Sequence, residues 1–157
     1  TSGAGVIFGV SGGVTEAVIR RISDDKSTPA LRAIPFMGVR GLQGVKETSI
    51  DYNGREVKIA IVSGIKNAEN LIKKMQRGEK SYDFVEVMAC PGGCICGAGQ
   101  PVTDSAGKKR RSAGLYETDR MSTIKRSEEN PITRALYAGL LKGKVHKLLH
   151  VHYHGKA

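Results

Sequence analysis

A short apolar segment that ends in a loop rich in cysteine and glycine constrains the fold of this chain most. Residues 83–89 are typical of a buried strand, and Cys90-Pro-Gly-Gly-Cys94-Ile-Cys96-Gly-Ala-Gly-Gln-Pro101 follows at once. All three cysteines lie in this stretch. Glycines let the backbone approach an inorganic cluster closely, and backbone amides can hydrogen-bond its sulfurs. The loop therefore predicts an iron–sulfur site more strongly than inert buried thiols or a disulfide.

The spacing of the cysteines narrows the chemistry. Cys90-x-x-x-Cys94-x-Cys96 differs from the Cys-x-x-Cys pairs of zinc ribbons, ferredoxins and thioredoxin-like proteins. Three cysteines cannot complete a four-thiolate site, and all four histidines lie at the far C-terminus, from His146 onward. Either another group supplies a ligand, or this chain holds only part of the site.

The rest of the chain alternates segments typical of strands and of helices. Asn53-Gly54 separates the β-prone runs 48–52 and 57–62, a strong hairpin signal because both turn residues need positive φ. A helix is expected at 67–77, with Gly78 as its end. The inward face of this helix is expected to carry Ala68, Leu71, Ile72 and Met75. Nearer the N-terminus, a strand is expected near 5–9 and a helix at 14–22, with positions 14, 17, 18 and 22 facing inward. The region 24–44 is expected to be mostly irregular.

These elements predict an α/β fold with a partly parallel sheet, flanking helices, an antiparallel hairpin and a helical C-terminal tail. Tail helices are expected at 112–125 and 130–142. The second has Asn130 as its cap, Pro131 at its first position and Gly143 beyond its end. Ligand sites in such sheets lie beyond the carboxyl ends of the strands, so Phe8-Gly9 and Cys90 are expected near each other.

The formal charge of +10 and the pI of about 9.7 raise the question of an acidic partner. The only basic run is Lys108–Arg111, and no aromatic side chains interleave with it, so nucleic acid is not favoured. A solvated helix start fits this run best; the alternative is a docking patch for an acidic electron carrier such as ferredoxin, or for an acidic missing half of the protein. The sequence has no run of about eighteen apolar residues, so no membrane-spanning helix is expected. Clustered thiols favour a reducing compartment such as the cytoplasm. The periplasm stays open, because we expect that this sequence does not include the native N-terminus.

Two other motifs each allow more than one interpretation. The turn Gly9-Val-Ser-Gly-Gly13 lacks the spacing of phosphate-binding loops, so a nucleotide site is not favoured. An anion-binding helix start and a tight turn that simply needs glycine both remain. The run His150-x-His152-x-His154 has donors for a divalent metal, although a solvated tail explains it equally well.

Together these motifs resemble the iron-only ([FeFe]) hydrogenases. Met88-Ala-Cys-Pro-Gly-Gly-Cys94-x-x-Gly-x-Gly-Gln-Pro101 is similar to the third cluster-binding signature of that family. The N-terminal block 1–17 resembles the segment upstream of that signature, while 129–132 and 148–153 resemble the small-subunit tail. The two earlier signatures, which bring the other cluster cysteines and the proton-relay cysteine, are absent here. The resemblance implies a C-terminal lobe of the catalytic domain at 1–101, and a crossover and small-subunit-like tail at 102–157.

The same resemblance implies a function, reversible oxidation of H2 and reduction of protons, and a cofactor, a [4Fe-4S] cluster bridged to a diiron centre. Cys90 would bind the cubane and Cys94 would bridge it to the diiron centre, with Phe8, Gly9 and Met88 lining the cofactor pocket. Cys96 departs from the family pattern and is not expected to be a ligand. The missing N-terminal half would be the main partner, so the isolated chain is expected to be inactive. A non-catalytic partner-binding lobe and a basic nucleic-acid-binding protein with a metal site are the alternatives.

Overall fold

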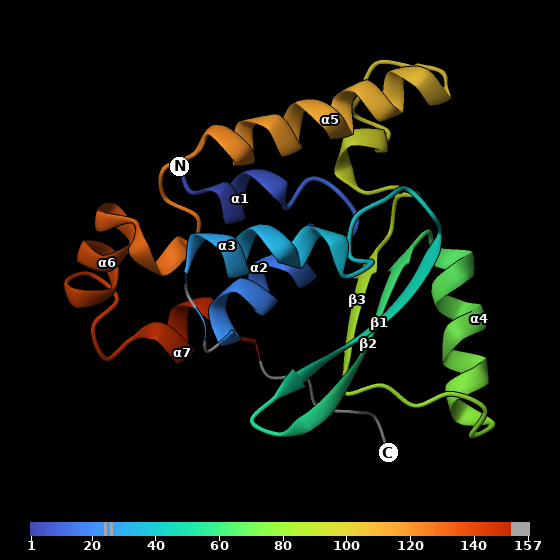
Figure 1. Cartoon of the computed structure of the whole chain (residues 1–157), viewed down its shortest axis with the longest axis horizontal. Helices are drawn as coiled ribbons and strands as arrows, with labels where there is room; N and C mark the ends of the chain where they lie inside the picture. The colour runs from blue at the N-terminus through green and yellow to red at the C-terminus, as the bar shows by residue number, and fades with distance from the viewer. Residues whose placement is uncertain (24, 26, 152–157) are drawn as a thin grey trace.

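The computed structural model describes residues 1–151 apart from 24 and 26. It contains a three-stranded sheet in the order β1-β2-β3, covered by helices on both faces (Figure 1). The strands are β1 (Val45–Tyr52), β2 (Arg55–Ser63) and β3 (Phe84–Met88). The helices are α1 (Gly3–Ile7), α2 (Gly13–Ile22), α3 (Thr28–Ala33), α4 (Ile65–Gln76), α5 (Ser105–Met121), α6 (Pro131–Ala138) and α7 (Val145–Leu149), with 3-10 turns η1 (Ile34–Phe36), η2 (Cys94–Cys96) and η3 (Ser127–Glu129).

The sheet confirms the predicted α/β class and its mixed strand directions. β1 pairs with β2 in antiparallel register from Val45–Val62 to Tyr52–Arg55. Asn53 and Gly54 form the hairpin turn with φ values of 54° and 74°, as the sequence predicts. β3 is parallel to β2, because α4 provides the crossover between them.

Two apolar clusters hold the helices against the two faces of β2. On one face, Ile59 and Ile61 pack against α2, α3 and η1; on the other, Ala60 and Val62 pack against α4. β2 is therefore buried on both faces from Ile59 to Ser63, as its continuous apolar run indicates. In α4, Ala68 and Leu71 are buried and Met75 packs beside them, but Ile72 is 53% exposed, so its inward placement was wrong.

The predicted strand near 5–9 is wrong, because residues 3–7 form helix α1. The Ser2 hydroxyl caps the helix by accepting a hydrogen bond from the Gly5 amide at 3.2 Å. Ala4 and Ile7, three positions apart, are both buried. Three consecutive apolar residues are too few to separate a strand from a short buried helix, and here the cap decides.

The region 24–44 is also more regular than expected. Ser27 caps α3 by accepting from the Ala30 amide at 3.4 Å, and η1 continues the helical path. Leu31, Ile34 and Val39 join the apolar cluster beneath the sheet. The two prolines, 29 and 35, lie in the first turns of α3 and η1, where a missing amide is tolerated.

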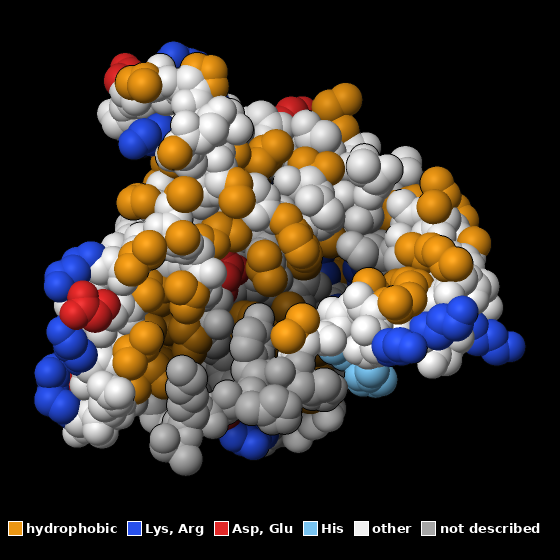
Figure 2. Space-filling view, turned by 180° about the vertical axis from the view of Figure 1, so that it is seen from behind, with side chains coloured by type: hydrophobic (Ala, Val, Ile, Leu, Met, Phe, Trp, Pro, Cys, Tyr) orange, Lys and Arg blue, Asp and Glu red, His pale blue; other side chains and the backbone are white. Residues whose placement is uncertain are grey.

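The tail is helical as predicted, although its boundaries differ. α5 begins at Ser105 rather than 112, because the Asp104 carboxylate accepts from the Gly107 amide at 2.7 Å. Asn130 and Pro131 start α6 as expected, whereas Gly143, at φ 70°, lies between α6 and α7. Figure 2 shows apolar side chains gathered on the part of the molecule that carries these last helices. Ile132 on α6 and Leu140 just after it are both largely exposed. In the described part of the chain, no helix has the length and apolar character needed to cross a membrane.

A buried ion network attaches the tail to the rest of the fold. On α2, Arg20 donates to the carboxylates of Glu16 (2.5 Å) and of Asp119 on α5 (2.7 Å). Arg40 donates to the same two carboxylates and lies 4.1 Å from the ring centroid of Tyr116. The most buried face of α2 is therefore partly charged: Glu16 and Arg20 are buried, while positions 14, 17, 18 and 22, predicted to face inward, are only half-buried.

Candidate cluster site

The cysteine loop leaves the carboxyl end of β3 and folds back on itself. The Gly93 amide donates to the Cys90 carbonyl and the Gly97 amide to the Cys94 carbonyl, both at 3.0 Å. All three thiols are free; those of Cys90 and Cys96 are half-buried, and Cys94 is exposed. The loop is thus an ordered turn that presents thiols without a disulfide.

The glycine turn after α1 packs directly against this loop. The Ile95 amide donates to the Gly9 carbonyl at 3.1 Å, and the Ser11 amide donates to the Gly92 carbonyl at 3.2 Å. A Cβ at Gly93, whose φ is 98°, would lie 2.7 Å from the Gly9 carbonyl oxygen. Glycine is needed there because the two backbones touch. The two segments lie together as expected, although Phe8 follows a helix rather than a strand.

A buried carboxylate on β3, that of Glu86, holds the glycine turn in place by accepting hydrogen bonds from it. Glu86 accepts from the Gly12 amide at 2.6 Å, the Thr15 amide at 2.7 Å and the Thr15 hydroxyl at 2.8 Å. Gly12 has no side chain with which to cap helix α2, so the Glu86 carboxylate on strand β3 caps it instead. These amides are the groups that an external anion would use, so the structure favours a structural role for the turn.

The buried ammonium group of Lys46 on β1 completes this support. It donates to the carbonyls of Ser11 and Val39 at 2.9 Å and of Gly41 at 2.8 Å. Burial lowers the pKa of Lys46 to about 8, while the nearby Glu86 charge opposes the shift. Sequence reasoning missed both residues; the signal for Glu86 is a carboxylate inside an otherwise apolar strand.

Replacing Glu86 by glutamine should lower the free energy of unfolding by about 2–3 kcal/mol, because the amide group loses the charge and turns one donor toward buried N–H groups. Urea denaturation followed by circular dichroism measures the change. Glu56→Gln on the neighbouring strand is the control, since Glu56 is exposed and should change stability little. Equal effects of the two substitutions would contradict the capping role of Glu86.

Missing Cβ atoms leave room beside two of the thiols. A Cβ at Gly97 would lie 3.3 Å from the Cys90 Sγ, and one at Gly92 would lie 3.1 Å from the Cys96 Sγ. Phe8, at the end of α1, is 46% exposed, and Met88, at the end of β3, is half-buried. An apolar ring, a thioether and open thiols therefore lie at the same end of the fold.

The donor set fits part of an iron–sulfur site but not a whole one. Among the described residues, no group of three or more His, Cys, Asp or Glu side chains is placed to hold a metal ion. The thiols of Cys90 and Cys94 are soft donors of the kind that iron–sulfur clusters use, and any side chain at Gly97 would crowd the Cys90 thiol. Their assignment as ligands stays a prediction.

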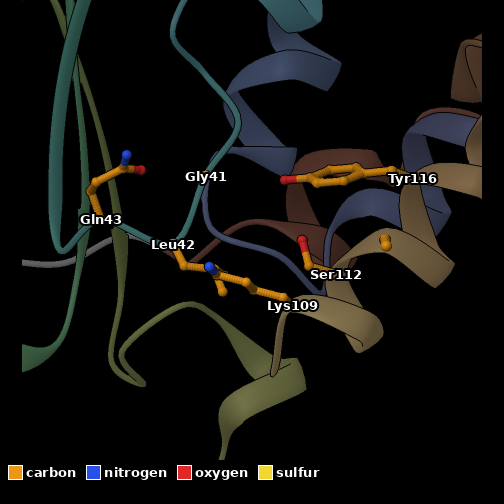
Figure 3. A pocket seen from close by; sticks show the side chains of 7 residues that line it. Gly41, Leu42, Gln43, Lys109, Ser112 and Tyr116 are labelled. Carbon is orange, nitrogen blue, oxygen red and sulfur yellow. The ribbon is translucent and has the colours of Figure 1, made fainter. Parts of the chain in front are cut away.

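The basic run at the start of α5 is partly structural. The Arg111 guanidinium donates to the carbonyl of Ile95 at 3.0 Å and to that of Pro101 at 2.6 Å. These two hydrogen bonds attach the cysteine loop to α5. A cleft of about 630 Å³ opens nearby between the loop Gly41–Gln43 and α5, where Lys109, Ser112 and Tyr116 line it (Figure 3). The interpretation of this run as a purely solvated helix start was therefore incomplete.

Comparison with known proteins identifies the family. The model of the iron-only hydrogenase large subunit, C-terminal domain, matches residues 1–98, and that of the iron hydrogenase small subunit matches 105–156. The chain belongs to the iron-only hydrogenase family. This confirms the resemblance predicted from the cysteine loop.

Individual relatives agree with this placement. The chain is 36% identical to iron hydrogenase 1 of Clostridium pasteurianum over 97% of its length, and 42% identical to the periplasmic [Fe] hydrogenase large subunit of Nitratidesulfovibrio vulgaris over 90%. A cytosolic Fe-S cluster assembly factor of Xenopus tropicalis is 32% identical over 93% of the chain. The chain spans 28%, 29% and 32% of these three proteins.

Solved structures show the same relationship in three dimensions. A variant of the [FeFe]-hydrogenase HydA1 from Chlamydomonas reinhardtii matches 93% of this chain with a TM-score of 0.64 and 36% identity. The chain covers 45% of that structure. The mixed sheet and flanking helices of this chain therefore match part of the fold of that [FeFe]-hydrogenase.

Proposed function

We propose that this chain forms one part of the catalytic domain of an iron-only hydrogenase, which interconverts H2 with protons and electrons. The observation that supports this most is the pair of free thiols, Cys90 and Cys94, on a loop held by the glycine turn and Arg111. The similarity supports hydrogenase over cluster assembly, since the hydrogenases above are 36% and 42% identical and the assembly factor 32%.

In this proposal each residue of the site has a distinct role. Cys90 would hold a [4Fe-4S] cluster, and Cys94 would be the ligand that this cluster shares with a diiron centre. The bound cofactor supplies the redox iron at which protons are reduced. Phe8, Gly9 and Met88 line the diiron pocket, where the ring and the thioether keep water away and the glycine permits close approach of the backbone.

The remaining ligands and the proton relay come from an upstream half of the catalytic domain. Residues 1–101 act as one lobe of the domain, and 102–157 as the crossover and tail. Lys109 and Arg110 are exposed on α5 next to the cysteine loop, where a small acidic electron carrier of the ferredoxin type would find complementary charge.

The isolated chain should show no hydrogenase turnover and retain no stable diiron centre, because two cysteines cannot replace four cluster ligands. The test is expression with the maturation machinery, followed by H2 evolution from reduced viologen and an iron count. The control is the same chain co-expressed with the upstream half of the domain, which should evolve H2.

Three results would contradict the proposal. Robust turnover by the isolated chain would refute its role as a part of the domain. A completed domain that binds its iron–sulfur cluster but evolves no H2 would instead favour the cluster-assembly branch of its relatives. Salt-dependent retention on DNA would favour the nucleic-acid alternative.

A further inference from the structure

The last helix brings two histidines together. His146 is the second residue of α7, and His150, four positions further on, is the C-cap residue just beyond the helix. Their Nδ1 atoms lie 2.7 Å from each other. The ring centroids are 4.6 Å apart with an interplanar angle of 76°. Both residues are exposed, so ions in solution can reach the pair. The sequence suggested a different set, His150, His152 and His154, of which the last two lie outside the described residues.

At this distance one Nδ1–H donates a hydrogen bond to the other Nδ1, and the tautomer decides which of the two is the donor. A metal ion can take the place of that proton. With metal–nitrogen bonds of 2.0–2.1 Å in tetrahedral geometry, the two nitrogens would be roughly 3.3 Å apart. The rings therefore need to separate by only about 0.6 Å, which small χ rotations on an exposed helix can supply. Histidines four residues apart on one helical turn form zinc sites in other proteins.

The surroundings determine what kind of ion can bind. His150 caps the C-terminal end of α7, where the peptide carbonyls favour a cation, and its amide donates to the His146 carbonyl at 3.3 Å. Lys144 and Lys147 are close in sequence and add positive charge, so coordination bonds rather than charge attraction must supply the affinity. Imidazole donors select zinc, cobalt, nickel or copper over magnesium or calcium.

We propose that His146 and His150 form a two-imidazole site for a divalent transition metal, separate from the cysteine loop. Water fills the remaining coordination positions. The site depends neither on the cluster nor on the upstream half of the domain, so it can be tested on this chain alone.

The test is a zinc titration followed by ¹⁵N NMR of the imidazole nitrogens, with Cys90, Cys94 and Cys96 replaced by serine so that thiolates do not compete. One equivalent of Zn²⁺ should shift the Nδ1 resonances of His146 and His150 together. His146→Ala or His150→Ala should each abolish the shift of the remaining partner. The matched control, His152→Ala with His154→Ala, should leave the titration unchanged.

Other results would overturn the proposal. Loss of binding in the His152→Ala, His154→Ala double variant, with binding kept in His146→Ala, would place the metal on the terminal run instead. Shifts in all four histidines that continue past one equivalent would indicate adventitious binding only. Circular dichroism of each variant confirms that the chain is folded, so a loss of binding can be attributed to the missing imidazole.

Discussion

Replacing Cys94 by serine in the completed catalytic domain is expected to abolish H2 evolution. In the proposed site its thiolate is the only one shared by the cubane and the diiron centre, and a hard alkoxide is a poor replacement for a soft thiolate on iron. Cys94 is also exposed in the isolated chain, so the substitution removes no packing contact from a core. A loss of activity in a folded protein can therefore be assigned to the cofactor.

The other two cysteines provide the controls. Cys90→Ser should lower the content of the cubane first, because Cys90 is assigned to that cluster alone. Cys96→Ser should leave cluster content near normal, since Cys96 is not among the assigned ligands. Iron counts and electron paramagnetic resonance on the three variants distinguish these outcomes. If Cys96→Ser lost as much iron as Cys94→Ser, the ligand assignment would be wrong and a three-cysteine site would replace it.

The parts of the fold that were predictable from sequence are those specified by local chemistry. Asn53-Gly54 fixes the hairpin because few other residue pairs adopt two positive φ values. The continuous apolar run of β2 signals a strand buried on both faces. Asn130-Pro131 marks the start of α6 by capping and by a preset φ. The sequence also shows that all the cysteines lie in one short loop, while the role of Cys90 and Cys94 as ligands stays a prediction.

The parts that failed depend on contacts between distant segments. Residues 5–9 looked like a strand because their apolar side chains follow no helical period. In the structure residues 3–7 form helix α1, and the carbonyls of Ile124 and Lys125 in the tail accept hydrogen bonds from its first amides. The amides of Gly12 and Thr15, which donate to Glu86, lie 74 and 71 residues away from it in the sequence. The Asp119 carboxylate lies 99 residues away from Arg20. No local pattern predicts such pairings. A charged residue in an apolar strand, or on the inner face of a helix, shows only that a partner must exist.

Removing the carboxylate of Asp119 should destabilise the protein by about 3–5 kcal/mol, because Asp119→Ala leaves two guanidinium groups on one remaining carboxylate, that of Glu16. Arg20 is 3% exposed and cannot turn to water for compensation. Urea denaturation at neutral pH measures the loss. Since Asp119 lies on α5 and Arg20 on α2, the tail should detach at lower urea concentration than the sheet unfolds, which limited proteolysis can follow.

Glu117→Ala is a matched control on the same helix. Glu117 pairs with Arg120, but both side chains are more than half exposed, and such surface pairs contribute about 0–1 kcal/mol. A second control replaces Arg20 by Met together with Asp119→Leu. Because exchange of a whole buried pair for apolar side chains is often nearly neutral, this double variant should recover part of the stability lost by Asp119→Ala. Equal stability of Asp119→Ala and Glu117→Ala would show that the network does not hold the tail.

Acidification should weaken the same network. Burial acts to raise the pKa of Asp119, but Arg20, Lys125 and Arg40 outweigh it and hold that pKa below its ordinary value. A carboxyl group whose pKa is lower in the folded state stabilises the protein above its unfolded pKa, about 3.9, and loses that contribution as the pH falls through the folded value. The wild-type chain should therefore lose stability on acidification below about pH 4 more steeply than Asp119→Asn, which has no charge to lose at that position. Parallel acid-denaturation curves for the two proteins would mean that the buried arginines are satisfied without Asp119, and that some other contact fixes α5 against α2.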